Sequence, residues 1–561
     1  MTGTFRDIRI HVPFVLLVVV LGVYLGLKTF PEEGWSGWKE GSAQTMLTLE
    51  HWDRDGILEH RALFIPIGNS KAVRHIDDPA LRQHARGIVT GKLIGNRLYY
   101  THYPPGYLLP FAALKLAGAD ERYAFRLLSL GMSLSALVLM YAFLVRLSTP
   151  AIAFFGALYY GASSMFLDFS DSLANQPIDD LLRFAILFLS ISALRAEERL
   201  KKRYTAFIWA LFFILAASSY DSVIFVFLWL VGLDYVQWLK DKGKQKKPVP
   251  IKKWALYAAA PVAAFVIQQV QNFWYLGWND LVLDLKGVFL YRVASGGSTG
   301  GVWRHFTEVF TALNLATGIP GLYSVPAIAA VVIAIVYLRK HIFYRWPELS
   351  FFVLLLVAGS AYSMIFSRTA DLDYQGRQLS PALAMLAGSG AVLFLRTAIS
   401  PRALFNRKGG LGRVALSGLL FISLAVLFLG QAKRTVEYVK DWPNHAVDPM
   451  GLNIYKALNR MTDNDAVIFS VDKNSRKRYP QAPPTFEYYA GDMVLSFQDP
   501  ADMMRDLKTL RELSTEPFDV IIFTPQFEII EEMLPYSRGR EVKVLGGGYF
   551  ALLIEGSFAG R

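Results

Sequence analysis

Apolar runs of about twenty residues recur along most of this 561-residue chain, and they decide its fold class. A helix of about twenty residues crosses the roughly 30 Å hydrocarbon core of a bilayer. Hydrophobic residues make up 53% of the chain, which is more than ordinary soluble domains carry. We therefore predict a polytopic α-helical membrane protein with about eleven transmembrane helices. These spans are expected near residues 11–29, 122–147, 150–168, 179–196, 204–220, 222–239, 253–275, 321–338, 349–367, 379–397 and 412–431.

The basic residues predict how the chain is oriented. The net charge is +12, and the lysines and arginines fall mainly in short loops between apolar runs. With a cytoplasmic N-terminus, every strongly basic loop lies on the cytoplasmic side, as the positive-inside rule requires. These loops are Arg195–Tyr204, Lys240–Lys253, Tyr337–Arg345 and Arg396–Arg413. The charge is thus explained without a nucleic-acid partner, and we expect an integral protein of the plasma (inner) membrane surrounded by membrane lipids.

The two ends of the chain add further expectations. The first apolar run, Val12 to Leu27, lacks a small-residue cleavage site, so we interpret it as a retained helix and not as a signal peptide. An odd number of spans places the C-terminal region outside the cytoplasm. The absence of cysteine excludes disulfide bonds and thiolate metal sites.

The last 130 or so residues are no longer membrane-like, and they alternate strand-like and helical patterns. Strands are predicted at Ala466–Val471, Asp519–Thr524 and Tyr549–Ile554, with a helix at Met503–Leu513. This alternation favours a small α/β domain. We therefore divide the chain into a transmembrane domain, residues 1–432, and an extracytoplasmic α/β domain, residues 433–561. Residues 30–105 form the first extracytoplasmic loop of the transmembrane domain.

Carboxylates gather at the predicted outer ends of helices and in outer loops, while the spans themselves hold few ionisable groups. The outer carboxylates are Glu32, Glu33, Glu40, Asp53, Asp55, Asp171, Asp179, Asp180, Asp371 and Asp373. A transporter would instead carry charged groups near the bilayer midplane. The polar chemistry of the chain is therefore predicted at one face of the membrane.

The first outer loop begins with the segment Phe30–Gly56, which holds Glu33 and Glu40. Glu40 opens a helical pattern that runs through Leu49, and tryptophans in the segment suit a helix lying in the membrane interface. Solvation of a loop and capping of a helix would also account for any one of these carboxylates. As a group they fit that explanation less well.

Asp179 and Asp180 follow Pro177 at the predicted start of a span. Acidic side chains in a first helical turn interact favourably with the helix dipole. This interaction explains one aspartate better than two. Arg377 lies at the outer end of another span, close to Tyr374. An arginine there can extend to the interface as an anchor, or its planar cation can bind a phosphate head group. Together these residues suit an amphiphilic substrate that has an apolar tail and an anionic head.

The stretch THYPPGYLLP, Thr101 to Pro110, contains two polar residues, His102 and Tyr103, followed by two prolines and an apolar segment. Proline favours extended backbone at the residue before it and is accommodated at a helix start. A helix is therefore predicted to begin at Pro104 or Pro105. The adjacent His102 and Tyr103 are either interface anchors or part of a site held at a fixed depth beside lipid.

The longer stretch Thr101–Leu130 resembles polytopic glycosyltransferases of the GT-C class that use polyprenyl-phosphate sugars, such as the protein O-mannosyltransferases and the aminoarabinose transferases of lipid A. The resemblance rests on His102-Tyr103 before Pro104-Pro105, on Leu116-Ala117-Gly118 and on Arg126-Leu127. It extends loosely to Ala43–Trp52, Asp179/Asp180 and Arg377–Leu386, and to an extracytoplasmic C-terminal domain. The match covers the first 200 or so residues well and the rest in layout.

The resemblance implies transfer of a sugar from a polyprenyl-phosphate donor to a hydroxyl of a lipid, glycan or protein acceptor, with inversion at the anomeric carbon. It implies that a carboxylate acts as the base. The family usually has an adjacent acidic pair at the start of the first-loop helix, but the residues that align there, near Trp35-Ser36, are not acidic. The base is then Glu40 or Glu33, and Glu40 is favoured because it directly precedes the helix. The family's lysine before the two prolines is also replaced, by His102-Tyr103.

The remaining roles follow from the same resemblance. Arg377, together with His102 or Arg126, would stabilise the phosphate leaving group, and Asp179 or Asp180 would orient the sugar or acceptor. A divalent metal held by carboxylates and His102 is compatible with the composition, but no spacing specifies one. Two other classes stay open: a transporter or flippase of a lipid-linked sugar, and a membrane scaffold that displays the C-terminal domain.

Overall fold

The structure is a computed structural model that describes residues 8–30, 39–65, 101–242 apart from 102, 248–293, 349–365, 375–399, 410–441 and most of 449–555, with isolated residues between 311 and 333. The chain forms two compact units. The first comprises Met1–Pro31, Arg122–Gln268 and Phe289–Trp442, and the second comprises Glu32–Glu121, Gln269–Val288 and Pro443–Arg561.

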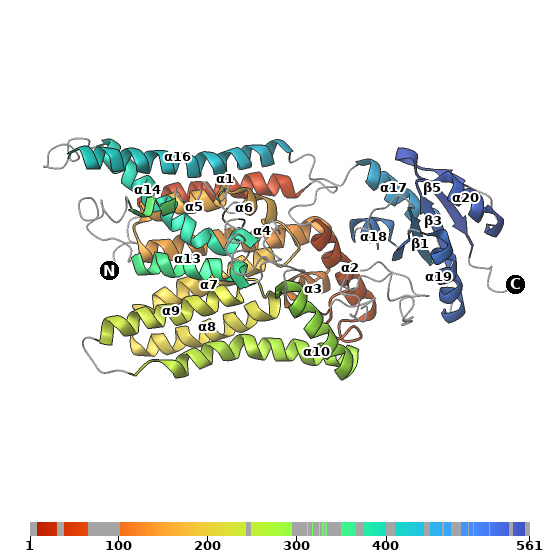
Figure 1. The fold of residues 1–561 in the computed structure, drawn as a ribbon, viewed down its shortest axis with the longest axis horizontal. Coiled ribbons are helices and arrows are strands. Elements are labelled where there is room, and N and C mark those ends of the chain that lie inside the picture. The colour runs from red at the N-terminus through yellow and green to blue at the C-terminus, as the bar shows by residue number, and fades with distance from the viewer. Residues whose placement is uncertain are drawn as a thin grey trace, which may run out of the picture. The chain divides into compact units, whose positions relative to one another are not determined.

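The first unit is a bundle of helices (Figure 1). Its helices are α1 (Val12–Thr29), α4 (Arg122–Leu147), α5 (Pro150–Gly161), α6 (Ser164–Phe169), α7 (Gln176–Leu194), α8 (Glu198–Ser218), α9 (Val223–Lys242), the first part of α10 (Ile251–Val293), α13 (Leu349–Ile365), α14 (Ser380–Ile399) and α16 (Gly410–Asp441). A short 3-10 helix, η5 (Gln375–Leu379), leads into α14. Among the described residues, three stretches are long and apolar enough to cross a membrane: Arg9–Thr29, Arg122–Leu147 and Gly376–Leu395. The chain is therefore a membrane protein of mostly helical structure, and the total of about eleven spans stays a prediction.

The span predicted at 150–168 is divided into two helices, which corrects that expectation. Ser163 has an extended backbone (φ −70°, ψ 142°), and its hydroxyl accepts a hydrogen bond from the amide of Phe166. This is the geometry of a helix N-cap, so α6 begins anew after α5 has ended. Pro150 starts α5 in the same way, behind the capping side chain of Thr149.

Small residues let the helices of the first unit approach closely. A methyl group on Gly388 of α14 would lie 2.2 Å from the carbonyl oxygen of Ile152 on α5, and one on Gly156 would lie 2.6 Å from the oxygen of Ala384. Helices in membranes associate through such small-residue contacts, because lipid tails give them little hydrophobic drive. The contact fixes α14, and with it the preceding η5, against α5.

The second unit combines short helices with a sheet. Its helices include α2 (Lys39–Asp55), α3 (Leu109–Leu116), α17 (Pro449–Asn459), α18 (Pro484–Ala490), α19 (Pro500–Leu513) and α20 (Phe527–Met533), with 3-10 turns at η3 (Pro105–Leu108), η7 (Leu534–Tyr536) and η8 (Gly546–Gly548). The segment Gln269–Val288 of α10 also belongs to this unit, and within it Gly277 (φ 73°) breaks the helical path. As predicted, a helical segment begins at Pro105, and Pro104 before it is extended.

The sheet has five strands in the order β2-β1-β3-β5-β4. Figure 1 labels three of them, β1, β3 and β5, in blue. The strands are β1 (Ala466–Val471), β2 (Met493–Phe497), β3 (Asp519–Thr524), β4 (Val542–Val544) and β5 (Phe550–Ile554). β1 lies parallel to β2 and β3, while β5 runs antiparallel to β3 and β4. Residues Ile468, Ile521 and Phe523 belong to its buried core. Helix α19 and strands β1, β3 and β5 lie where the sequence pattern predicts them.

Candidate active site

Two adjacent aspartates at the start of α7 form the centre of a buried polar cluster in the first unit. Helix α7 begins at Gln176 with Pro177 in its first turn, so Asp179 falls in that turn and Asp180 directly after it. Both side chains face the interior, with relative exposures of 0% and 8%. Isolated carboxylates are too costly to bury, so the surrounding groups must compensate for their charge.

Asp180 is held by three groups from three elements. The hydroxyl of Tyr160 on α5 donates to its Oδ2 at 2.7 Å. Arg183, one helical turn further along α7, donates from Nη2 to its Oδ1 at 2.6 Å. Arg377 of η5 places Nη1 3.6 Å from the same oxygen. The carboxylate of Asp180 is therefore fixed in position by charge and by hydrogen bonds.

Asp179 is held more loosely. The hydroxyl of Ser222, just before α9, donates to its Oδ2 at 2.6 Å, and Arg377 Nη2 lies 3.5 Å from that oxygen. The other oxygen, Oδ1, is buried and has no hydrogen-bond partner among the described residues. A buried carboxylate oxygen in that state is a strong acceptor for a donor such as a sugar hydroxyl.

A third carboxylate extends the cluster. Asp221 is buried, and the amide of Asn175 donates to its Oδ2 at 3.3 Å and to the hydroxyl of Ser219 at 3.0 Å. Three carboxylates therefore share the site with two guanidinium groups, those of Arg183 and Arg377. One negative charge is in excess, which is costly in a buried site and is more typical of a functional site than of a structural one.

Arg377 is positioned by tight backbone packing beside it. The next residue, Gln378, donates from its side chain to the carbonyl of Asp221 at 3.2 Å. A methyl group on Gly359 of α13 would lie 2.6 Å from the carbonyl oxygen of Gln378. Helix α13 can therefore lie this close to η5 only because residue 359 has no side chain.

This packing predicts the effect of Gly359→Ala. The added methyl group must push η5 away from α13, which costs about 1–3 kcal/mol and displaces Arg377. We expect a lower thermal midpoint in detergent and a roughly tenfold loss of the activity proposed below. Gly131→Ala in α4 is the matched control, since nothing lies within 4 Å of the added methyl group. Equal rates and midpoints for the two variants would show that the contact does not position Arg377.

A second buried cluster links Asp171, in the loop before α7, to α1 and α4. Lys28 donates from Nζ to Asp171 Oδ1 at 3.1 Å, and Arg126 donates from Nε to Asp171 Oδ2 at 3.0 Å. Thr29 donates to the same Oδ2 at 3.1 Å. Arg126 and Lys28 have exposures of only 2%. This cluster fixes the end of α1, the start of α4 and the loop before α7 to one another.

The residues singled out from the sequence fall in several places. Asp179, Asp180 and Arg377 are brought together in the first cluster, and Arg126 belongs to the second. Glu40 lies in the first turn of α2, in the second unit, and is partly exposed. Tyr103 is partly buried, with its ring 6.4 Å from that of Tyr107. Glu33, His102 and Tyr374 lie outside the described residues.

Sequence reasoning did not assign roles to five members of the first cluster. These are Tyr160, Asn175, Arg183, Ser222 and Asp221. Arg183 carries a readable signal, because a basic residue three positions after Asp180 lies on the same helix face. Asn175 directly precedes α7. Tyr160 lies on α5, and Asp221 and Ser222 lie just before α9, and no local pattern links these three residues to α7.

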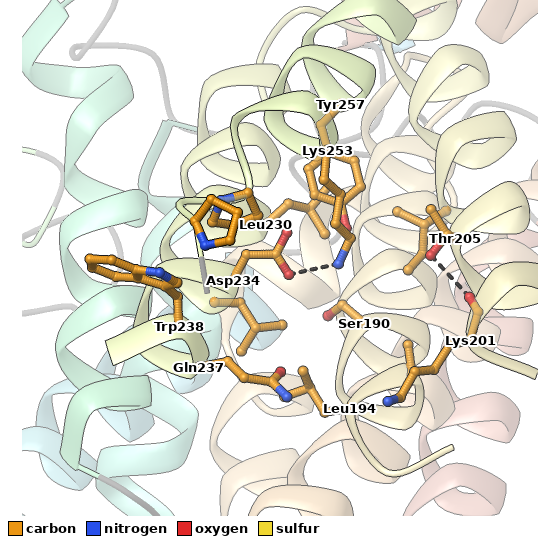
Figure 2. Close-up of a pocket in the computed structure, with 15 residues that line it drawn as sticks. Ser190, Leu194, Lys201, Thr205, Leu230, Asp234, Gln237, Trp238, Lys253 and Tyr257 are labelled. Atoms are coloured by element: carbon orange, nitrogen blue, oxygen red, sulfur yellow. Dashed lines mark hydrogen bonds and ion pairs between the residues drawn. The ribbon is translucent and has the colours of Figure 1, made fainter. Parts of the chain in front are cut away.

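A pocket of about 260 Å³ lies beside the C-terminal end of α7, whereas the aspartates lie at its N-terminal end. Figure 2 shows Ser190 and Leu194 of α7 on its wall together with residues of α8 and α9 and with Lys253 of α10. Asp234 and Lys253 form an ion pair of 2.7 Å within it. Ser190 follows Asp179 by about 16 Å along the helix, given the rise of 1.5 Å per residue. The pocket therefore does not contain the carboxylate cluster.

The fold can be compared with those of solved proteins. No protein-family model matches the chain, and no curated protein matches it in sequence. The structure of ArnT from Cupriavidus metallidurans bound to undecaprenyl phosphate matches over 98% of this chain and 99% of its own, with 14% identity and a TM-score of 0.54. ArnT in the apo state matches over 98% and 99%, with 13% identity and a TM-score of 0.52.

The archaeal oligosaccharyltransferase AglB from Archaeoglobus fulgidus, in complex with an inhibitory peptide and a dolichol-phosphate, covers 91% of this chain and 69% of its own at 12% identity. Its TM-score of 0.48 is too low to support an argument about the fold. The likeness to ArnT extends over nearly the whole of both chains. It shows that the two proteins share a fold, in agreement with the resemblance predicted from the sequence.

Proposed function

We propose that this protein is an integral membrane glycosyltransferase of the GT-C type. It moves a sugar from a polyprenyl-phosphate donor to a hydroxyl of a lipid, glycan or protein acceptor on the extracytoplasmic face. The observation that carries the proposal is the buried cluster of Asp179, Asp180 and Arg377 in a chain with the fold of ArnT. That ArnT was solved with undecaprenyl phosphate bound supports a polyprenyl phosphate as the lipid part of the donor.

The chemistry assigns a role to each group. The acceptor oxygen attacks the anomeric carbon, the bond from that carbon to the phosphate oxygen breaks, and polyprenyl phosphate leaves with the electron pair. The acceptor proton passes to a carboxylate base. Arg377 stabilises the negative charge that develops on the phosphate, and Asp179 Oδ1 accepts a hydrogen bond from a sugar or acceptor hydroxyl. In-line attack inverts the anomeric configuration.

The base is proposed to be Glu40, with Glu33 as its rival. Glutamine keeps the size of the side chain but cannot take up the proton, so Glu40→Gln is expected to lower the transfer rate about 10²–10⁴-fold. The binding of the donor should be unchanged. The measurement is the initial rate of polyprenyl phosphate release by purified protein, with Glu33→Gln tested beside it. A rate that falls only in Glu33→Gln would identify Glu33 as the base. Full rates in both variants would show that neither residue is the base.

A transporter or flippase of a lipid-linked sugar is the alternative function. The observation in its favour is the group of buried charges on α7, η5 and the loop before α9, since charged groups buried within a helical membrane bundle also mark transport pathways. The two functions differ in products. A transferase breaks the sugar–phosphate bond, whereas a flippase moves the donor between leaflets and leaves it intact.

A further inference from the structure

The chain that follows α2 turns back and lies along the last turns of that helix. Gly56, directly after α2, has φ +94°, which turns the chain sharply. The hydroxyl of Thr48 donates to the carbonyl of Ile65 at 2.9 Å and accepts from its amide at 3.0 Å. The indole of Trp52 donates to the carbonyl of Leu63 at 3.1 Å. Residues 56–65 are therefore pinned to the same helix from which they emerge.

This turn brings three metal-ligating side chains together. His51 and Asp55 lie four positions apart on one face of α2, and the turn returns His60 to them. One ligand atom of each residue lies within 4.8 Å of the other two. His60 Nε2 is 3.0 Å from Asp55 Oδ2, and the two imidazole rings lie 5.8 Å apart. Both histidines are buried, with exposures of 2% and 7%.

The guanidinium group of Arg54 already contacts two of these three side chains, His51 and Asp55. Arg54 donates from Nη2 to His51 Nδ1 at 2.8 Å and to Asp55 Oδ2 at 2.8 Å. Because a guanidinium only donates, His51 Nδ1 is an acceptor there and keeps its lone pair. The side chain of Arg54 is 29% exposed, so it can swing into solvent without opening the core. The cluster is thus arranged around a cation that can be exchanged.

We propose that His51, Asp55 and His60 bind a first-row divalent metal ion, with zinc as the preferred ion, in place of the Arg54 guanidinium. Two imidazoles and one carboxylate are ligands that zinc accepts, and they leave a coordination position for solvent. All three ligands come from ten consecutive residues, so the metal fastens the segment 56–65 onto α2. This site goes beyond the proposed transferase function, and it does not depend on it.

The test uses the full-length protein purified in detergent and stripped of metal with a chelator. Calorimetric titration with zinc is expected to find one site that His60→Ala weakens at least a hundredfold. Arg54→Ala is expected to tighten binding, because it removes the competing cation and leaves the buried ligands in place. The exposed neighbour provides the control, since Glu59→Gln should leave the affinity unchanged. Zinc should also raise the thermal midpoint of the unmodified protein and of Arg54→Ala, as binding to the folded state requires.

The alternative is an ion-pair network of Arg54, Asp55 and His60 that closes the turn without metal. In that case neither the unmodified protein nor Arg54→Ala binds zinc, and that result overturns the proposal. Zinc binding that is the same in His60→Ala as in Glu59→Gln overturns it as well, because the ion would then lie elsewhere. Since Arg54→Ala alters a partly exposed side chain, its result stands even if His60→Ala does not fold.

Discussion

Replacement of Arg377 by alanine is expected to lower the rate of polyprenyl phosphate release about 10²–10³-fold, the usual effect of removing one charge-stabilising donor from an active site. The guanidinium lies 3.5 Å from Asp179 Oδ2 and 3.6 Å from Asp180 Oδ1, so it is held between two carboxylates. Arg377→Lys should recover only part of the rate. An ammonium is a point charge and cannot bridge two groups as a planar fork does.

Loss of Arg377 also changes the charge balance of the site. A second variant separates this effect on stability from the effect on the transfer rate. With alanine alone, three carboxylates share the site with one guanidinium, which should lower the thermal midpoint. Adding Asp179→Asn restores an excess of one negative charge and should recover much of the midpoint. The rate should stay low, because the arginine is still missing and because the substitution also removes the Asp179 carboxylate proposed to bind a hydroxyl. If the double variant regained the rate as well, Arg377 would act only by balancing charge.

Replacement of Asp171 by alanine is expected to have the largest effect on stability. It leaves Lys28 and Arg126 buried without the carboxylate that both contact, and breaking such a buried pair costs about 3–5 kcal/mol. The loss should appear as a large drop in the thermal midpoint in detergent and as low recovery of folded protein.

Asp120→Ala is the matched control for this prediction. Asp120 also pairs with a lysine, Lys115, but its side chain is 77% exposed. Exposed ion pairs contribute at most about 1 kcal/mol, so this midpoint should barely move. If Asp171→Ala proved no more destabilising than Asp120→Ala, the cluster around Lys28 and Arg126 would not hold the three segments together.

The sequence identifies Asp179, Asp180 and Arg377 as members of the candidate active-site cluster, but not the residues that surround them. These three residues stand out because they belong to a group of charged residues at one predicted face of the membrane. Their contact across the bundle depends on how α7 packs beside η5, which no local pattern encodes. Tyr160 is the clearest omission, since a tyrosine in an apolar helix is usually interpreted as an interface anchor. Here its hydroxyl contacts a buried carboxylate instead.

The secondary structure shows the same division between local and tertiary information. Strands β1 and β3 contain the buried apolar runs Ala466–Phe469 and Val520–Phe523, and such runs can be recognised without a structure. Strand β4 has only three residues with a lysine at its centre, so its periodicity is too short to detect. The break between α5 and α6 depends on the cap formed by Ser163. A pair of serines, Ser163 and Ser164, within a long apolar run is too common to predict such a break.

The measurement that tests the central claim most directly is the release of free polyprenyl phosphate by the purified protein from a panel of polyprenyl-phosphate sugars. The account predicts release from at least one donor, accelerated by a hydroxyl acceptor and lost in Arg377→Ala. It also predicts that the sugar is recovered on the acceptor with inverted configuration. The contrary result is a folded protein that binds these donors and moves them between leaflets but leaves every sugar–phosphate bond intact. That outcome would identify a transporter and remove the catalytic roles assigned to Asp179, Asp180 and Arg377.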